Sequence, residues 1–375
     1  MEKATQRRKL EHIRMVVSSS VEALESNLLD MVRIVHEPLP EIDLDEVDIS
    51  VRFCGGKKLK APLMITGMTG GHPDVERING DLAEIAEKHG IAMGVGSQRA
   101  AIEDPSTART YRIARERAPT TVIVANLGAP QLSRGYGVRE AEEAVSMLEA
   151  DALAIHLNPG QEAYQDEGDP FYSGVLGKLV ELSESLKTPI ILKETGTGLS
   201  RKTVRLARAA GIKCFDVAGL GGTNWIKAEV VRSKAKHGKP VKPAGPLSDY
   251  WGNPTAISIV EARLAALDSF IVGSGGIRNG LEAAKAISLG ADVAGIALPA
   301  LRALVNSGKQ ALDELVSAII YQVKTVAFMT GSKTVYGLWR APLTIYGRLA
   351  EELRARGVDV EDYIYRTRLK ALYWR

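Results

Sequence analysis

Short apolar runs recur along the chain, separated by segments whose apolar residues are spaced as on one face of a helix. The runs are continuously apolar, without alternation, which is typical of parallel strands covered on both faces. We therefore predict strands at eight places: 61–66, 91–96, 121–126, 152–157, 189–194, 213–219, 270–276 and 292–298.

Helical segments lie between most of these runs, and several end at a glycine, a common helix stop. Eight strand–helix units in succession predict an α/β protein built as a (β/α)8 TIM barrel over residues 61–300. A doubly wound open sheet is the alternative, but no G-x-G-x-x-G motif joins the first strand to the first helix. The predicted helical segments include 81–90, 140–150, 202–211 and 281–290.

Two parts of the chain fall outside the repeat. Residues 1–60 form an N-terminal extension, and residues 301–375 are expected to form C-terminal helices that pack on the barrel. Within the barrel, the connection 220–269 is about twice the usual length and is predicted as one long loop. Because it contains Trp225, Tyr250, Trp251 and several prolines, we expect a lid or an interface element there, not a disordered linker.

Composition narrows the possible partners. The 375 residues are 45% hydrophobic and 25% charged, with a net charge of +3, so nothing indicates a nucleic-acid surface. Cys54 and Cys214 have no C-x-x-C spacing, which argues against a zinc site or a disulfide framework and favours the reducing cytoplasm. The start lacks the pattern of a signal peptide and no run of 18 apolar residues occurs, so a soluble protein without membrane contact is expected.

Polar side chains follow five consecutive strands at the point where each strand ends. In a barrel these ends share one face, where active sites lie, whereas a solvated rim would explain any one of them alone. The stretch IHLNPGQE is the densest example, because a buried strand runs directly into hydrogen-bonding side chains. The ring comprises Thr66, Met68, Thr69, Ser97, Gln98, Arg99, Asn126, His156, Asn158, Gln161, Glu162, Lys193 and Glu194.

Two glycine-rich turns, 219–223 (GLGGT) and 273–280 (GSGGIRNG), follow the sixth and seventh strands. Glycines let backbone N–H groups approach a phosphate, and Arg278 beside Gly275 and Gly276 indicates the phosphate of FMN or of a sugar. Tight loop geometry alone is the alternative. The basic start QRRKLEHI could close over a diphosphate through charge-assisted hydrogen bonds, or could simply begin a solvated helix.

Several motifs together resemble the type 2 isopentenyl diphosphate isomerases, in order from residue 8 to the ALP at 297–299. They are RKLEHI (8–13), MTGG (68–71), GSQR (96–99), HLNPGQE (156–162), LKETGTG (192–198), GGT (221–223) and SGGIRNG (274–280). The resemblance implies an FMN-dependent (β/α)8 enzyme that interconverts isopentenyl and dimethylallyl diphosphate without net redox change. It also implies Mg2+, flavin reduction by NADPH or NADH, and a homo-tetramer or homo-octamer.

The resemblance also implies roles for individual residues. Gln161 and His156 would be the catalytic residues, with reduced FMN as the acid–base group and Gln161 helping to relay the proton, and Glu162 would bind Mg2+. The substrate would be held by Arg8, Lys9, His12, Ser97, Arg99, His156, Asn158 and Gln161. FMN would be surrounded by Thr66, Gly67, Met68, Thr69, Ser97, Asn126, Lys193, Thr223, Gly275, Gly276, Arg278, Ala297 and Leu298.

Two other functions compete with this interpretation. A hydroxy-acid oxidase would share the barrel and the glycine turns, but it should carry a histidine followed by Gly-x-Arg near the seventh strand. The nearest histidine is His237, within the charged stretch AKHGKP. A flavin-binding sensor would have no need for Glu162 beside a basic N-terminal arm. The stretches ETGTG and SDYWGNPT (248–255) depart from the usual family pattern and leave the contacts of the long connection open.

Overall fold

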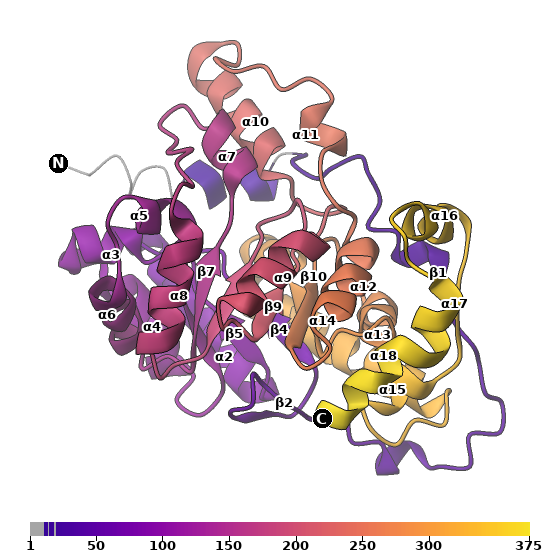
Figure 1. Ribbon diagram of the computed structural model, residues 1–375. Coiled ribbons are helices and arrows are strands. Elements are labelled where there is room, and N and C mark those ends of the chain that lie inside the picture. Colours follow the sequence, from indigo (N-terminus) through magenta and orange to yellow (C-terminus); the bar gives the residue numbers. More distant parts are fainter. Residues whose placement is uncertain (1–10, 14, 19) are drawn as a thin grey trace.

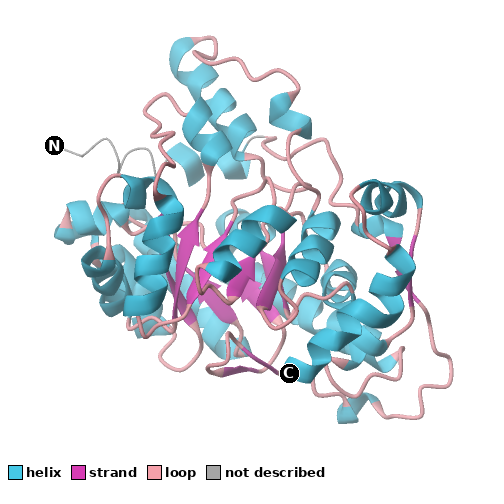
Figure 2. Ribbon diagram, in the orientation of Figure 1, coloured by secondary structure: helices cyan, strands magenta, loops and turns pink. Residues whose placement is uncertain are grey.

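A computed structural model describes residues 11–375 except 14 and 19. Its centre is a closed barrel of eight parallel strands in the order β10-β11-β4-β5-β6-β7-β8-β9 (Figures 1 and 2). The predicted barrel is therefore confirmed and the open sheet is excluded. The strands are β4 (Leu63–Ile65), β5 (Ala92–Gly94), β6 (Ile123–Gly128), β7 (Ala152–His156), β8 (Ile190–Lys193), β9 (Cys214–Asp216), β10 (Phe270–Ser274) and β11 (Val293–Ile296).

Nearly every residue of these strands is buried, which explains why their sequences are continuously apolar. Helices enclose the barrel (Figure 2), and the four predicted helical segments lie in α2, α6, α9 and α13. Side-chain caps fix two starts: Ser200 accepts from the N–H of Thr203, and Asn279 from that of Glu282. The outer helices are α2 (Glu76–His89), α4 (Arg109–Arg117), α6 (Val138–Leu148), α8 (Val175–Ser185), α9 (Arg201–Ala209), α12 (Thr255–Ala265), α13 (Gly280–Ser288) and α14 (Leu298–Phe328).

The connection 220–269 differs from the expected long loop, because it contains α10 (Trp225–His237), α11 (Leu247–Tyr250) and the barrel helix α12. Helix α10 escapes pattern recognition because its buried residues include Glu229, Arg232 and Ser233 beside few apolar ones. Helices α10 and α11 stand with the short α7 (Pro159–Tyr164) beyond the carboxyl ends of the strands (Figure 1). The region is thus an ordered cap beside the barrel opening.

The N-terminal extension and the C-terminal segment meet on the outside of the barrel. Strand β1 (Val32–Ile34) pairs antiparallel with β12 (Leu343–Ile345), and β2 (Val51–Arg52) forms a hairpin with β3 (Lys58–Leu59). The C-terminal elements gather on one side (Figure 1) and include α15 (Gly337–Arg340), α16 (Gly347–Ala355), α17 (Val360–Asp362) and α18 (Arg368–Lys370). No helix among the described residues is long and apolar enough to cross a membrane.

The amino end of the barrel is closed by a buried charged network. The Asp292 carboxylate accepts from Arg263 at 2.8 Å, from the backbone N–H of Ile271 at 2.8 Å and from Nη2 of Arg375 at 2.9 Å. The Arg263 guanidinium lies over the ring of Trp339, 4.8 Å from its centroid, and also donates to backbone carbonyls. Every charge here has a partner, so the network fits a structural role.

The two cysteines lie near this same end. Cys54 and Cys214 are distant in sequence but neighbours in the fold, and both are free thiols. Burial, and then the adjacent Cys214, raise the pKa of the Cys54 thiol well above its ordinary value. Neither thiol takes part in a group of ligands that could hold a metal among the described residues.

Candidate active site

A cavity opens at the carboxyl ends of the barrel strands, where sequence patterns predicted a ring of polar side chains. Its empty space, counted together with the open solvent at its mouth, is about 1290 Å³. Its walls come from nearly all the strand ends, from α10 and α14, and from the N-terminal segment through His12, Ile13 and Val16. The cavity thus joins the barrel opening to the cap helix α10 and to the N-terminal segment.

Most of the predicted site residues meet in this cavity. Its lining includes every residue predicted to surround FMN: Thr66, Gly67, Met68, Thr69, Ser97, Asn126, Lys193, Thr223, Gly275, Gly276, Arg278, Ala297 and Leu298. It also includes His12, His156 and Gln161 from the predicted substrate and catalytic residues. Arg99, Asn158 and Glu162 lie outside the lining, and Arg8 and Lys9 lie outside the described residues.

The two glycine turns press against each other at one end of the cavity. A Cβ at Gly275 would lie 2.2 Å from the carbonyl oxygen of Gly219, and one at Gly222 would lie 2.5 Å from the nitrogen of Gly276. Gly275 and Gly276 also have φ angles of 108° and 72°, which other residues rarely adopt. Only glycine permits this approach, and with Arg278 at the rim the turns form a cradle suited to a phosphate.

Polar side chains at the ends of β6 and β7 hold one another in place. Asn126 donates its Nδ2 to the carbonyl of Val95 at 2.9 Å, so its Oδ1 is the acceptor for Nδ1 of His156 at 2.8 Å. The hydrogen-bond network therefore places a proton on Nδ1 of His156. In the neutral ring, Nε2 then carries the lone pair. The pair fixes the orientation of the imidazole toward the cavity.

Lys193 and Asp216 occupy the ends of β8 and β9, where they are register partners. The Lys193 ammonium donates to the backbone carbonyl of Glu194 at 2.7 Å, while the Glu194 carboxylate turns back to accept N–H groups from Thr195, Gly196 and Gly198. Glu194 thus shapes its own loop and does not face a ligand. Burial raises the pKa of Asp216, although Lys193 and a hydrogen bond from the Ser274 hydroxyl oppose this shift.

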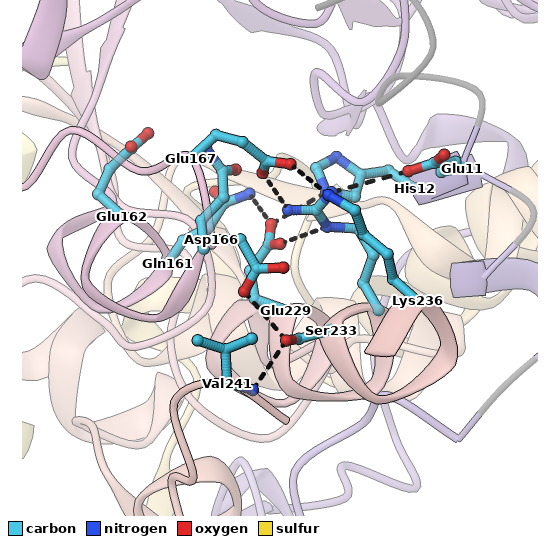
Figure 3. A network of polar contacts seen from close by, with 12 residues as sticks. Glu11, His12, Gln161, Glu162, Asp166, Glu167, Glu229, Ser233, Lys236 and Val241 are labelled. Carbon is cyan, nitrogen blue, oxygen red and sulfur yellow. Dashed lines mark hydrogen bonds and ion pairs between the residues drawn. The ribbon is translucent and has the colours of Figure 1, made fainter. Parts of the chain in front are cut away.

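Gln161 belongs to a buried network that the sequence patterns did not reveal (Figure 3). Its Nε2 donates to Oε1 of Glu229 at 2.9 Å, and Nε2 of His12 lies 2.9 Å from the same oxygen. Arg232 donates to the other oxygen of Glu229 at 2.8 Å. Burial alone would raise the pKa of Glu229, but His12, Arg232 and Gln161 outweigh it and lower the pKa to about 2. Glu229 is therefore an anion behind Gln161 at neutral pH.

A second layer of ion pairs attaches α10 to the loop after α7 (Figure 3). Arg232 also donates to Glu167 at 2.6 Å, and Ser233 donates to Asp166 at 3.0 Å. The pKa of Glu167 falls to about 2, because Arg232 and Lys236 outweigh the effect of burial. Glu229 and Arg232 are spaced i, i+3, so their ion pair could have been predicted from the sequence if this segment had been identified as a helix.

Glu162 points away from the Glu229 cluster (Figure 3). Its two carboxylate oxygens accept from Nδ2 of Asn158 at 2.8 Å and from the backbone N–H of Asp169 at 2.7 Å. No group of three or more His, Cys, Asp or Glu side chains could hold a metal in the described part of the chain. Each oxygen keeps a lone pair, so Glu162 fits a Mg2+ that is bound mainly by water and substrate oxygens.

Arg99 is already paired with carboxylates at the mouth of the site. Arg99 pairs with Glu103 at 2.6 Å and with Asp169 at 3.4 Å.

The connection 220–269 supplies no histidine of the kind expected in a hydroxy-acid oxidase. His237 does not line the cavity, and its Nε2 lies 3.1 Å from Asp166. Of the aromatic residues expected to form a lid or interface, Trp225 lines the cavity, whereas Tyr250 and Trp251 are exposed.

Comparison with solved structures shows the fold. The flavin-binding domain of baker's yeast flavocytochrome b2 superposes with a TM-score of 0.63 at 16% identity, covering 91% of this chain and 83% of that one. A mandelate oxidase variant with an FMN adduct gives a TM-score of 0.58 at 14% identity, covering 88% and 95%. A family model described as FMN-dependent dehydrogenase matches residues 172–344.

Curated relatives match over nearly the full length of the chain. The isopentenyl-diphosphate delta-isomerase of Aeropyrum pernix is 62% identical, over 99% of this chain and 98% of the relative. The enzymes of the same name from Metallosphaera sedula and Methanosarcina mazei are 46% and 42% identical, over 95% and 96% of this chain and 97% of each relative. The protein therefore belongs to the FMN-dependent, type 2 isopentenyl-diphosphate delta-isomerase family.

Proposed function

We propose that this protein interconverts isopentenyl diphosphate and dimethylallyl diphosphate for isoprenoid biosynthesis, with FMN in the barrel cavity and Mg2+ at its mouth. One observation carries the proposal. The cavity at the carboxyl ends of the strands contains the complete predicted flavin surround together with His12, His156 and Gln161. The 62% identity to the Aeropyrum pernix isomerase, over nearly the full length of both chains, supports the same reaction.

FMN fits the polar and charged groups that line the cavity. The glycine turns with Arg278 suit its phosphate, and Lys193, which is only 7% exposed, lies at the cavity wall as a cation for an electron-rich ring. When bound in its reduced form, FMN supplies the acid–base group for proton transfer at the substrate alkene. The protein contributes the binding, the orientation and the electrostatic surroundings of that transfer.

Gln161 is the residue we place in proton relay. Its amide is held at both ends, because Nε2 donates to Glu229 and Oε1 accepts from Asn158 at 3.1 Å. An amide fixed in this way presents one dipole direction to the cavity, and such preorganised dipoles stabilise developing charge without reorganising. Glu229 remains ionised because of its lowered pKa, and its negative charge favours positive charge near Gln161.

The diphosphate would be held at the mouth by the predicted substrate residues. His12, Ser97 and His156 line the cavity, and Arg99 and Asn158 stand just outside, already paired with carboxylates. We propose that Arg8 and Lys9 complete this set and that Glu162 binds Mg2+ together with diphosphate oxygens and water. A diphosphate arriving there would share Arg99 with Asp169 and Asn158 with Glu162.

Three further features belong to the proposal. NADPH or NADH would reduce the flavin, the protein would work in the cytoplasm, and it would assemble as a homo-tetramer or homo-octamer. The free thiols of Cys54 and Cys214 support a reducing compartment. Among the aromatic residues near the C-terminus, Tyr346 and Trp374 are exposed and available for such an interface, whereas Trp339 is buried in the core.

The decisive experiment measures isopentenyl diphosphate turnover without oxygen, in the presence of FMN and Mg2+, with and without NADPH. We expect dimethylallyl diphosphate in catalytic excess over the NADPH consumed, and loss of product when EDTA removes the metal. Stoichiometric consumption of NADPH, or no product from protein that retains FMN, would reject the isomerase. Product that forms equally well in EDTA would reject the metal while leaving the isomerase in place.

A further inference from the structure

We propose that residues 21–29, here named the cradle strap, form a third wall of the flavin phosphate site. Within the strap, Asn27 is a positioning residue that holds the two glycine turns in the shape that receives the phosphate. This inference rests on the proposed binding of FMN and goes beyond it, because it assigns part of phosphate recognition to the N-terminal extension.

The strap adds to the first glycine turn in the manner of a short strand. Ala23 donates its N–H to the carbonyl of Gly222 at 2.9 Å, and Asn224 donates to the carbonyl of Val21 at 2.8 Å. Between these bonds, Glu22 and Thr223 form an antiparallel bridge. The turn that supplies Thr223 to the cavity is therefore fixed by residues roughly 200 positions earlier in the sequence.

Asn27 joins the two turns through its side chain and its backbone. Its Nδ2 donates to the carbonyl of Gly276 at 2.9 Å, and its backbone carbonyl accepts from Ala256 at 3.0 Å. Its Oδ1 accepts from the N–H of Leu29 at 2.9 Å, which fixes the rotation of the amide. A Cβ at Gly221 would lie 2.3 Å from the backbone nitrogen of Asn27, so the first turn also touches this residue.

Charge on the strap completes the wall. The Glu22 carboxylate contacts the guanidinium of Arg278, which lines the cavity, and accepts from Nη1 of Arg302 at 2.9 Å. Lys227 donates to the backbone carbonyl of Glu22 at 3.0 Å. Burial would raise the pKa of Glu22, but the two arginines outweigh it and lower the pKa. The Lys227 ammonium is itself paired with Asp249 at 2.8 Å, so two arginines share the Glu22 carboxylate, and one of them, Arg278, lines the cavity where it can donate to an incoming phosphate.

Riboflavin separates phosphate recognition from ring recognition, because it carries the same ring without the phosphate. The test measures the Kd of FMN and of riboflavin for cofactor-free protein, by quenching of flavin fluorescence. Asn27→Ala should weaken FMN binding about tenfold, corresponding to ~1.4 kcal/mol, and should leave riboflavin binding within twofold of wild type. Ser26→Ala is the matched control, because the Ser26 hydroxyl bonds to Leu28 and Asp30 and, among the described residues, to neither glycine turn, so both affinities should remain unchanged.

Two results would overturn the inference. Wild-type FMN affinity in Asn27→Ala would show that Asn27 has no role in phosphate recognition. An equal loss of affinity for FMN and for riboflavin would show that Asn27 acts only as a general structural residue. If circular dichroism shows that Asn27→Ala does not fold, Asn27→Asp replaces it. That variant keeps the acceptor for Leu29 and removes the donor to Gly276, so the same selective loss of FMN affinity is expected. Unchanged FMN affinity in Asn27→Asp would contradict the inference.

The same measurements separate this inference from the proposed function. Wild-type protein that binds neither flavin would reject both the cofactor and the strap. Protein that binds FMN selectively over riboflavin, loses that selectivity in Asn27→Ala, but forms no dimethylallyl diphosphate would reject the isomerase and leave the strap supported.

Discussion

Two buried aspartates, at opposite ends of the barrel, have very different surroundings. Asp292 precedes β11 at the amino end, and its carboxylate accepts hydrogen bonds from Arg263, Arg375 and a backbone N–H. Asp216 ends β9 at the carboxyl end, and its Oδ2 is buried without a hydrogen-bond partner among the described residues. Both side chains are almost completely inaccessible to solvent.

The difference separates groups that hold the fold from groups that prepare a site. A buried charge whose partners are all present costs little, whereas a buried oxygen without a partner costs about 1–3 kcal/mol. Such a cost persists at positions where function requires it. The amino end therefore carries buried charge whose partners are present, whereas the carboxyl end, where the cavity opens, carries a buried carboxylate oxygen without a hydrogen-bond partner among the described residues.

The largest expected effect comes from breaking the network at the amino end. Asp292→Asn should destabilise the protein by about 3–5 kcal/mol, because two buried guanidinium groups lose their counter-charge. Urea unfolding measures the loss, and FMN affinity of the folded fraction should not change, because the cavity lies at the other end. A loss below 1 kcal/mol would show that this network does not hold the fold.

Next in size is the effect of removing the amide at the carboxyl end. Gln161→Ala should lower turnover about 10²–10⁴-fold, as expected for a group in proton transfer, with FMN affinity and melting temperature close to wild type. Anaerobic assays with saturating Mg2+ measure the change. Wild-type turnover in this variant would remove Gln161 from the reaction.

Glu229 provides a smaller effect that depends on pH. Its pKa falls from 4.5 to about 2 in the folded protein, so its stabilisation, about 3 kcal/mol at most, is fully present above pH 4.5 and is lost as pH falls toward 2. The difference in unfolding free energy between wild type and Glu229→Gln should therefore shrink between pH 5 and pH 2.5. Glu116→Gln, on a surface ion pair, serves as the control and should show almost no difference at any pH. A constant difference for Glu229→Gln would contradict the assigned shift.

The smallest effect should have the opposite sign to the first. Because the folded protein raises the pKa of Asp216, wild type loses stability as pH rises from the unfolded value of 3.8 through the folded pKa. Asp216→Asn removes that loss, so at pH 7 its melting temperature should equal or slightly exceed that of wild type. A loss of stability in Asp216→Asn as large as that of Asp292→Asn would show that the two ends of the barrel do not differ in this way.

Sequence patterns predicted the barrel well because its strands are buried on both faces and therefore apolar throughout. They failed at α10, whose inward side presents Glu229 and Arg232 where a helix normally presents apolar residues. The pairing of β1 with β12 was also beyond reach, since three-residue strands carry little pattern and their partners are distant in sequence.

For the site, the polar strand ends and glycine turns predicted which residues line the cavity. Local sequence could not predict how they are connected. The bond between Asn126 and His156, the carboxylate behind Gln161, and the engagement of Glu162 by Asn158 all depend on contacts between separate elements. Arg8 and Lys9 stay predictions, because they lie outside the described residues.

The pairing of β1 with β12 has a consequence for the order of events during synthesis. Strand β1 emerges from the ribosome early, but its partner at 343–345 is made only after every barrel strand. The cradle strap directly precedes β1, so it gains this anchor only when nearly the whole chain has been translated. Cofactor loading is therefore expected to be a late, post-translational step, completed by the part of the chain that was made first.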